Sequence, residues 1–307
     1  MRRILSIFLL AILLVMVVMP VSADSGSKPV LYMAEEDAPI PGATFEIYRV
    51  GEALANGKLA LTDDFSLYPV DPNTPGEDTS PQASILYSYA KMDGITPVDT
   101  TETNEKGFAA TKTLSDGLYL IAGQPFRYNG YIYYTEPQLI LLPQRDKDDG
   151  EIIEEPVLSV KFSRETAGDE PISRKVLKIW KDNNSNKRPS SLTVHLLKDG
   201  KVYDSVILRA SNQWRYVWEN LDSDAHWQII EDVPAGYTVT LEQEGLTFLL
   251  TNTAPELPPS ETTPTTPSGG KIDQTGMIWW PVILLGALGM LFIFIGILLR
   301  KEPSYDA

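Results

Sequence analysis

The chain has 307 residues, a formal net charge of -15 and no cysteine. An acidic surface repels phosphate backbones, which argues against a nucleic-acid partner, and the lack of cysteine excludes disulfides and cysteine-ligated metals. The two histidines, His195 and His226, are too few for a histidine metal site, so we expect neither a metal nor a cofactor.

The N-terminus has the three parts of a secretory signal peptide. Arg2 and Arg3 precede an apolar core at residues 4–19, and Val21-Ser22-Ala23 ends that core in small residues. We therefore predict that residues 1–23 are a signal peptide, cleaved after Ala23. The alternative is that the segment stays uncleaved as a membrane anchor.

Residues 25–164 are predicted to form a first β-sandwich domain with a short helical insertion. Short runs rich in β-branched and aromatic residues indicate strands. Ser80-Pro81 combines an N-cap residue with proline at the first helical position, which predicts a helix over residues 82–91. The predicted strands are residues 43–50, 117–122, 131–142 and 156–160.

Three stretches of this domain resemble the first domain of sortase-assembled pilins: residues 40–48 (IPGATFEIY), 117–121 (GLYLI) and 136–143 (EPQLILLP). The strand before Ile40 lacks the lysine that would start an internal cross-link, so we predict none here. Shaft pilins carry an acceptor lysine in a YPKN-like motif, for which this chain offers only Lys161. The alternative for Lys161 is a surface lysine at a strand end, and its weak match favours a basal or minor subunit over a shaft subunit.

Residues 172–253 are predicted to form a second β-sandwich after a polar connection at residues 165–171. Seven short alternating runs in about 80 residues are typical of a sandwich. Asp199-Gly200 lies between two of these runs and predicts a hairpin turn. The runs are residues 175–180, 192–198, 201–208, 214–221, 227–231, 237–242 and 247–252.

This second domain resembles a Cna B-type domain along its whole length. The matching landmarks are KIWKDNN from Lys178, Arg188-Pro189, VHLLKDG from Val194, WQIIE from Trp227, PAGY from Pro234 and LTNT from Leu250. Domains of this family are β-sandwiches that often carry a spontaneous Lys–Asn isopeptide bond. The resemblance implies that Lys178 is the amine, Asn252 the carboxamide and Glu231 the catalytic acid.

The residues themselves support these roles. Val176, Lys178 and Trp180 share one strand face, and the two apolar neighbours make it the core face, which would bury the lysine and lower its pKa. Glu231 shares a face with Trp227 and Ile229, and burial would keep it protonated. The alternatives are an exposed strand lysine, a surface acid and, for Asn252, a turn residue.

The C-terminal part begins with a Pro/Thr-rich spacer at residues 254–271, which cannot form a core and favours extended conformations. Residues 272–276 (IDQTG) resemble the LPxTG sorting signal of Gram-positive wall-anchored proteins, with Asp273 in place of proline. An apolar run at residues 277–299 is long enough to span a bilayer, and Arg300-Lys301 follow it. The resemblance implies sortase cleavage between Thr275 and Gly276; the alternative is that the helix remains a membrane anchor.

Together these features predict an all-β surface protein with two tandem Ig-like sandwiches, a stalk and a C-terminal transmembrane helix, located outside a Gram-positive cell on its wall or membrane. We expect a structural protein, a minor or basal pilin-like subunit whose partners are a sortase, peptidoglycan or other pilin subunits. The alternative is an adhesin whose first domain binds a host or matrix ligand. An enzyme is not expected, because the sequence shows no nucleophile–base pair, phosphate loop or metal constellation.

Overall fold

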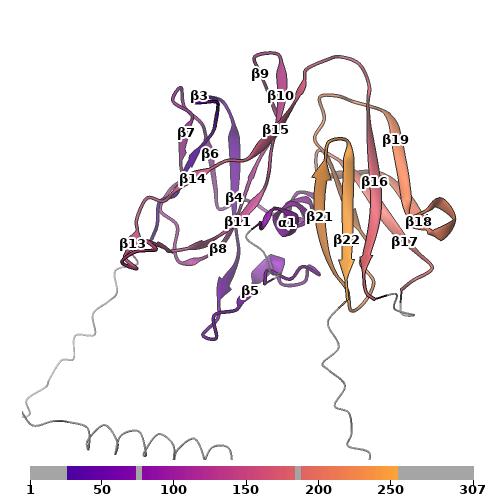
Figure 1. The fold of residues 1–307 in the computed structure, drawn as a ribbon, viewed down its shortest axis with the longest axis horizontal. Coiled ribbons are helices and arrows are strands. Elements are labelled where there is room, and N and C mark those ends of the chain that lie inside the picture. Colours follow the sequence, from indigo (N-terminus) through magenta and orange to yellow (C-terminus); the bar gives the residue numbers. More distant parts are fainter. Residues whose placement is uncertain (1–25, 74–77, 184–187, 255–307) are drawn as a thin grey trace, which may run out of the picture. The chain divides into compact units, whose positions relative to one another are not determined.

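The computed structural model describes residues 26–73, 78–183 and 188–254 (Figure 1). The predicted signal peptide, the spacer beyond Ala254 and the sorting signal with its apolar run at 277–299 lie outside these residues. Within the described ranges, no helix is both long and apolar enough to cross a bilayer.

The first domain is built around a sheet in the order β11-β8-β4-β5, with β6 also paired to β4. Its smaller sheets have the orders β14-β1-β7, β15-β10-β9, β12-β13 and β2-β3. The elements are β1 Val30–Tyr32, β2 Ala34–Glu35, β3 Ala38–Pro39, β4 Thr44–Ala53, β5 Leu59–Leu61, η1 Asp63–Phe65, α1 Ser80–Asp93, β6 Asp99–Glu102, β7 Phe108–Ala110, β8 Gly117–Gly123, β9 Phe126–Tyr128, β10 Tyr131–Thr135, β11 Gln138–Leu142, β12 Gln144–Arg145, β13 Ile152–Ile153, β14 Val157–Ser159 and β15 Phe162–Thr166.

The single strand predicted over residues 131–142 is wrong. The structure divides it into β10 and β11, which belong to different sheets. The break falls at Glu136-Pro137, where proline has no N–H to donate to a sheet. Tyr133 of β10 is 2% exposed and packs in the core.

The central sheet of the first domain is buried on both faces. Side chains alternate along β4, so that Phe45 and Ile47 lie in one core cluster while Tyr48 and Val50 lie in another. All seven residues of β8 are buried. The long apolar runs of these strands therefore reflect two packed faces, and each face needs a covering layer.

The layer over one of these faces is α1. The N-cap of this helix is Thr79, so the predicted cap at Ser80 is wrong by one position. The helix ends at Asp93, and its C-cap Gly94 has a left-handed φ of 67°. Nearly every side chain from Gln82 to Ala90 is buried. A helix that is buried all round lies inside a protein, and α1 does so in contact with β8 and β11 of its own domain and with β20 and β21 of the second.

The second domain is a sandwich of two sheets with the orders β19-β16-β22-β21 and β18-β17-β20. Each of the seven predicted strands is present, and the first and last strands, β16 and β22, are parallel neighbours. Asp199 and Gly200 both have positive φ, 52° and 79°, as a type I′ hairpin turn requires. The strands are β16 Ile172–Lys181, β17 Ser191–Lys198, β18 Lys201–Arg209, β19 Arg215–Leu221, β20 Trp227–Glu231, β21 Thr238–Glu244 and β22 Thr247–Thr253, with the short helix η2 at Ala210–Asn212.

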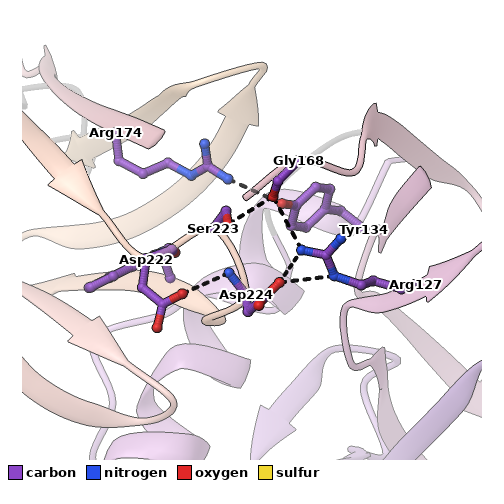
Figure 2. Close-up of polar contacts among 8 residues, drawn as sticks. Arg127, Tyr134, Gly168, Arg174, Asp222, Ser223 and Asp224 are labelled. Atoms are coloured by element: carbon purple, nitrogen blue, oxygen red, sulfur yellow. Dashed lines mark hydrogen bonds and ion pairs between the residues drawn. The ribbon is translucent and has the colours of Figure 1, made fainter. Parts of the chain in front are cut away.

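Polar contacts also join the two domains. Arg127, the central residue of β9, donates from Nε to Asp224 Oδ1 at 2.9 Å and from its terminal nitrogen to the carbonyl of Gly168 at 3.3 Å (Figure 2). Ser223 donates to the same carbonyl at 3.1 Å. The connection between the domains is thus held to a loop of the second domain and to β9 of the first.

The shared core predicts that the two domains lose stability together. Replacing Leu86, a fully buried residue of α1, with Ala should cost about 2–5 kcal/mol of unfolding free energy. The four tryptophans of the described residues all lie in the second domain, so their fluorescence should report a lower urea midpoint although the change is in the first. Leu67→Ala, at a residue 90% exposed, is the control. An unchanged tryptophan midpoint in Leu86→Ala would contradict the shared core.

Candidate functional site

The site lies in the core of the second domain, and its first member is Lys178 on β16. Alternation along the strand places Val176, Lys178 and Trp180 on the same face, and Val176 is fully buried. The Lys178 side chain has no exposed surface. A lysine is almost never fully buried without a partner, so the groups around its amine need to be identified.

Glu231 faces this amine from the opposite sheet. It is the last residue of β20, and its side chain is also fully buried. Its Oε2 lies 3.1 Å from Lys178 Nζ. The amine also donates to the backbone carbonyl of Leu250 on β22 at 3.2 Å. The lysine therefore spans the sandwich, with a carboxyl group on one side and a strand backbone on the other.

Asn252 is the third member and lies on β22, the strand beside β16. The parallel register pairs Lys178 with Leu250 and Trp180 with Asn252, so Asn252 is two residues beyond the lysine's own partner and shares its face of the sheet. Asn252 is 0% exposed. The structure thus brings together the three residues to which the sequence assigned a joint role.

These groups are buried but poorly hydrogen-bonded. Within the described residues, neither the Asn252 carboxamide nor the two oxygens of Glu231 make a well-directed hydrogen bond. Buried polar groups are normally paired, and an unpaired cluster calls for an explanation such as chemistry at the site. Asn252 is still close enough to Glu231 to oppose the rise in its pKa.

The low-polarity surroundings favour the neutral forms of both ionisable groups. Burial lowers the pKa of Lys178 to about 8, although Glu231 opposes the shift. Burial likewise raises the pKa of Glu231, against the opposing effect of Lys178. Transfer of one proton from the ammonium to the carboxylate gives a neutral amine, which is a nucleophile, beside a neutral carboxylic acid, which can donate a hydrogen bond to a carboxamide.

The remaining residues singled out from the sequence lie elsewhere. Lys161 is exposed between β14 and β15, and its carbonyl accepts a hydrogen bond from the Glu136 N–H at 2.9 Å. His195, on β17, is within 2.8 Å of Ser205 Oγ and 3.3 Å of Asp232 Oδ1. Thr275 and Gly276 lie outside the described residues. In the described ranges, no group of three His, Cys, Asp or Glu side chains is arranged to hold a metal ion.

Sequence reasoning gave no role to a second buried carboxylate, Glu46 on β4. Its oxygens accept hydrogen bonds from Tyr48 at 2.8 Å, Tyr87 at 3.0 Å, Lys91 at 3.1 Å and Gln124 at 2.8 Å. Burial alone would raise the pKa of Glu46, but these donors hold it below its usual value. This carboxylate is fully satisfied and ties α1 to the sheet, in contrast to the unsatisfied groups around Lys178.

Sequence reasoning also gave no role to the residues that cover Lys178. Trp180 lies over the amine. Arg188 and Tyr237 contact the tryptophan, and both donate hydrogen bonds to Asp182. The residues Asp182 and Arg188 occur in the landmark motifs, but spacing alone does not show that they meet.

Comparison with known proteins finds similarity in the second domain. Residues 174–253 match the family model described as Cna protein B-type domain. Over 115 residues the chain is 32% identical to a collagen adhesin of Staphylococcus aureus; the match covers 31% of this chain and 10% of that protein.

The chain also matches solved structures, at low TM-score and low sequence identity. One B repeat unit of the collagen-binding surface protein of Staphylococcus aureus matches with a TM-score of 0.26 and 18% identity, covering 74% of this chain and 97% of that one. The basal pilin SpaE of Lactobacillus rhamnosus GG matches with a TM-score of 0.29 and 12% identity, covering 71% of this chain and 84% of that one.

The family match spans β16 to β22 and includes Lys178, Glu231 and Asn252. Residues 174–253 are therefore similar to Cna protein B-type domains along the whole of the second sandwich.

Proposed function

We propose that this protein is a structural component of a cell surface whose second domain cross-links itself through an isopeptide bond between Lys178 and Asn252. The observation that carries the proposal is the buried group of amine, carboxyl and carboxamide, with Lys178 Nζ 3.1 Å from Glu231 and the Asn252 carboxamide unpaired among the described residues.

The reaction needs no external reagent. Neutral Lys178 Nζ attacks the side-chain carbonyl carbon of Asn252, while protonated Glu231 polarises the carbonyl by a hydrogen bond. The bond from that carbon to the amide nitrogen then breaks, and a proton originally on Nζ passes through the Glu231 carboxyl to the departing nitrogen. One amide bond forms and one molecule of ammonia leaves. Holding the groups in contact contributes about 7–11 kcal/mol in well-oriented intramolecular reactions.

The bond would give the domain mechanical and thermal resistance. It would join the first and last strands, which are already parallel neighbours, so tension along the chain would pass through a covalent bond instead of a hydrogen-bonded ladder. If the model for disulfides applies, closing a loop of about 75 residues adds about 4 kcal/mol of stability through the unfolded state.

Display on a Gram-positive surface completes the proposal. It is supported by the surface proteins among the matches and by the signal-peptide and sorting-signal patterns of the sequence. A minor or basal pilin-like subunit fits a chain with no well-matched acceptor lysine. Among the described residues, no structural observation favours the adhesin alternative.

The folded chain should weigh less than its sequence by the mass of one ammonia molecule, and its digest should contain a peptide linking Lys178 to Asn252. Glu231→Gln keeps the volume of the side chain but removes the acid, so it should leave the full mass. Mass spectrometry of the intact and digested chain measures both. A wild-type chain that folds and retains its full mass would reject the cross-link.

Loss of the bond should also lower thermal stability. Lys178→Ala should lower Tm by about 8–16 °C, since about 4 kcal/mol is lost and each kcal/mol is worth about 2–4 °C in a cooperative unit of two domains. Lys181→Ala changes an exposed lysine of the same strand and should leave Tm nearly unchanged. Differential scanning calorimetry makes the comparison, and equal Tm values for the two variants would contradict a stabilising bond.

The rate of cross-linking should depend on pH. The Lys178 pKa of about 8 means that the amine is mostly protonated at lower pH, and the neutral fraction falls about tenfold for each unit below this value. Glu231, whose pKa is raised by burial, must keep its proton, so the rate should fall again at high pH. Refolding at a series of pH values, followed by mass, should give a bell-shaped profile; a flat profile would rule out this acid–base pair.

Anchoring can be tested in a Gram-positive host that expresses a sortase. Cleavage between Thr275 and Gly276 predicts that the protein is released with the wall fraction after wall digestion without detergent. Thr275→Ala should move it to the detergent-soluble membrane fraction, whereas Thr265→Ala in the spacer should not. Recovery of the unaltered protein only with detergent would show that the apolar run at 277–299 is a plain membrane anchor.

A further inference from the structure

The Lys178 amine is covered on one side by an aromatic ring. The ammonium nitrogen lies 5.0 Å from the centroid of Trp180, two residues along the same strand face. Trp180 itself is half-buried, while the lysine side chain has no exposed surface. The ring therefore lies on the solvent side of the amine, and its position controls the access of water to Lys178 Nζ.

Contacts with neighbouring side chains fix the position of this ring. Trp214 and Tyr237 meet it edge to face, with centroids 5.3 and 5.4 Å away. The guanidinium carbon of Arg188 lies 5.3 Å from its centroid. Within the described residues, the indole N–H has no hydrogen-bond partner, so no direct hydrogen bond holds the ring.

Two of these neighbours are held by a single buried carboxylate. Asp182 accepts a hydrogen bond from Arg188 Nε at 2.9 Å on one oxygen and another from the terminal nitrogen of Arg188 on the other oxygen. Tyr237 donates to it at 3.1 Å. The Asp182 side chain has no exposed surface, and charge-assisted hydrogen bonds of this paired kind are strong and directional.

We propose that Asp182, Arg188 and Tyr237 form a clamp that positions the Trp180 ring over the Lys178 amine and thereby sets the rate of the cross-linking step. This inference rests on the proposed function, since it concerns the same amine. The three are positioning residues: they act on the reaction through Trp180 and do not touch the atoms that react.

The physical link is access of water to the amine. Burial is the largest effect on the Lys178 pKa. The ionisable group that faces the amine directly is Glu231 on β20, and beyond Trp180 lie Asp182, Arg188 and Tyr237. If the clamp opens and the ring moves, water solvates the ammonium and the amine keeps its proton to higher pH. Less neutral amine is then present, although Lys178, Glu231 and Asn252 are unchanged.

The test compares clamp variants with matched controls in the full chain. The chain is purified in denaturant, its mass is checked to show that it has not reacted, and it is refolded at pH values from 5 to 10, with ammonia loss followed by mass spectrometry. Asp182→Asn removes the charge of the clamp, and Tyr237→Phe removes one hydroxyl while keeping the ring. The controls are Asp222→Asn, which changes the exposed partner of Lys198, and Tyr216→Phe, at an exposed residue.

We expect both clamp variants to lose about tenfold in rate at neutral pH, because the acidic side of the pH–rate profile should move up by about one unit. The controls should keep the wild-type profile. Tyr237→Phe keeps the test valid if Asp182→Asn does not fold, which circular dichroism would show.

Two outcomes would overturn the clamp while leaving the cross-link intact. One is a wild-type rate and profile in folded clamp variants. The other is a rate lowered by the same factor at every pH, which is the result of a merely structural role. A wild-type chain that folds without losing ammonia would instead reject the proposed function itself, so the two failures can be told apart.

Discussion

The exclusion of water from Lys178 is the constraint on which the site depends. An ammonium group in a dry core is costly, and the domain reduces the cost by placing Glu231 at 3.1 Å in surroundings that favour both neutral forms. The Asn252 carboxamide shares this space without a well-directed hydrogen bond to any described residue. A protein built only for stability would satisfy such groups, as this chain does around Glu46.

The two carboxylates show how surroundings decide the role of a side chain. Glu46 and Glu231 are both buried and both lie near a lysine. Glu46 accepts hydrogen bonds from two tyrosines, a glutamine and a lysine, which favour its charged form and attach α1 to the sheet. At Glu231 the opposing effects of Lys178 and Asn252 do not outweigh burial, so its pKa rises. The same residue type is thus a structural anchor in one domain and a candidate acid in the other.

Much of the second domain could be predicted because its strands are short, alternate regularly and end at clear turns such as Asp199-Gly200. The burial of Lys178 followed from the alternation of β16, and the family landmarks pointed to Glu231 and Asn252. The clamp could not be predicted, because Asp182, Arg188 and Tyr237 meet only after three separate segments have folded. The first domain was harder to predict from the sequence. Pro137 divides a run of strand-forming residues that looks continuous. The burial of α1 on all sides depends on packing against the second domain, which local sequence patterns do not reveal.

The parallel pairing of β16 and β22 has a consequence for how far this protein can stretch. The chain enters the domain at the start of β16 and leaves it at the end of β22, so pulling on its two ends slides these strands past each other in shear. If Lys178 is joined to Asn252, the cross-link carries the tension and the chain between these two residues is not extended. At about 3.3–3.6 Å per extended residue, roughly 250 Å of contour length then stays stored inside the domain, and a filament or stalk built from it would keep a fixed length under tension.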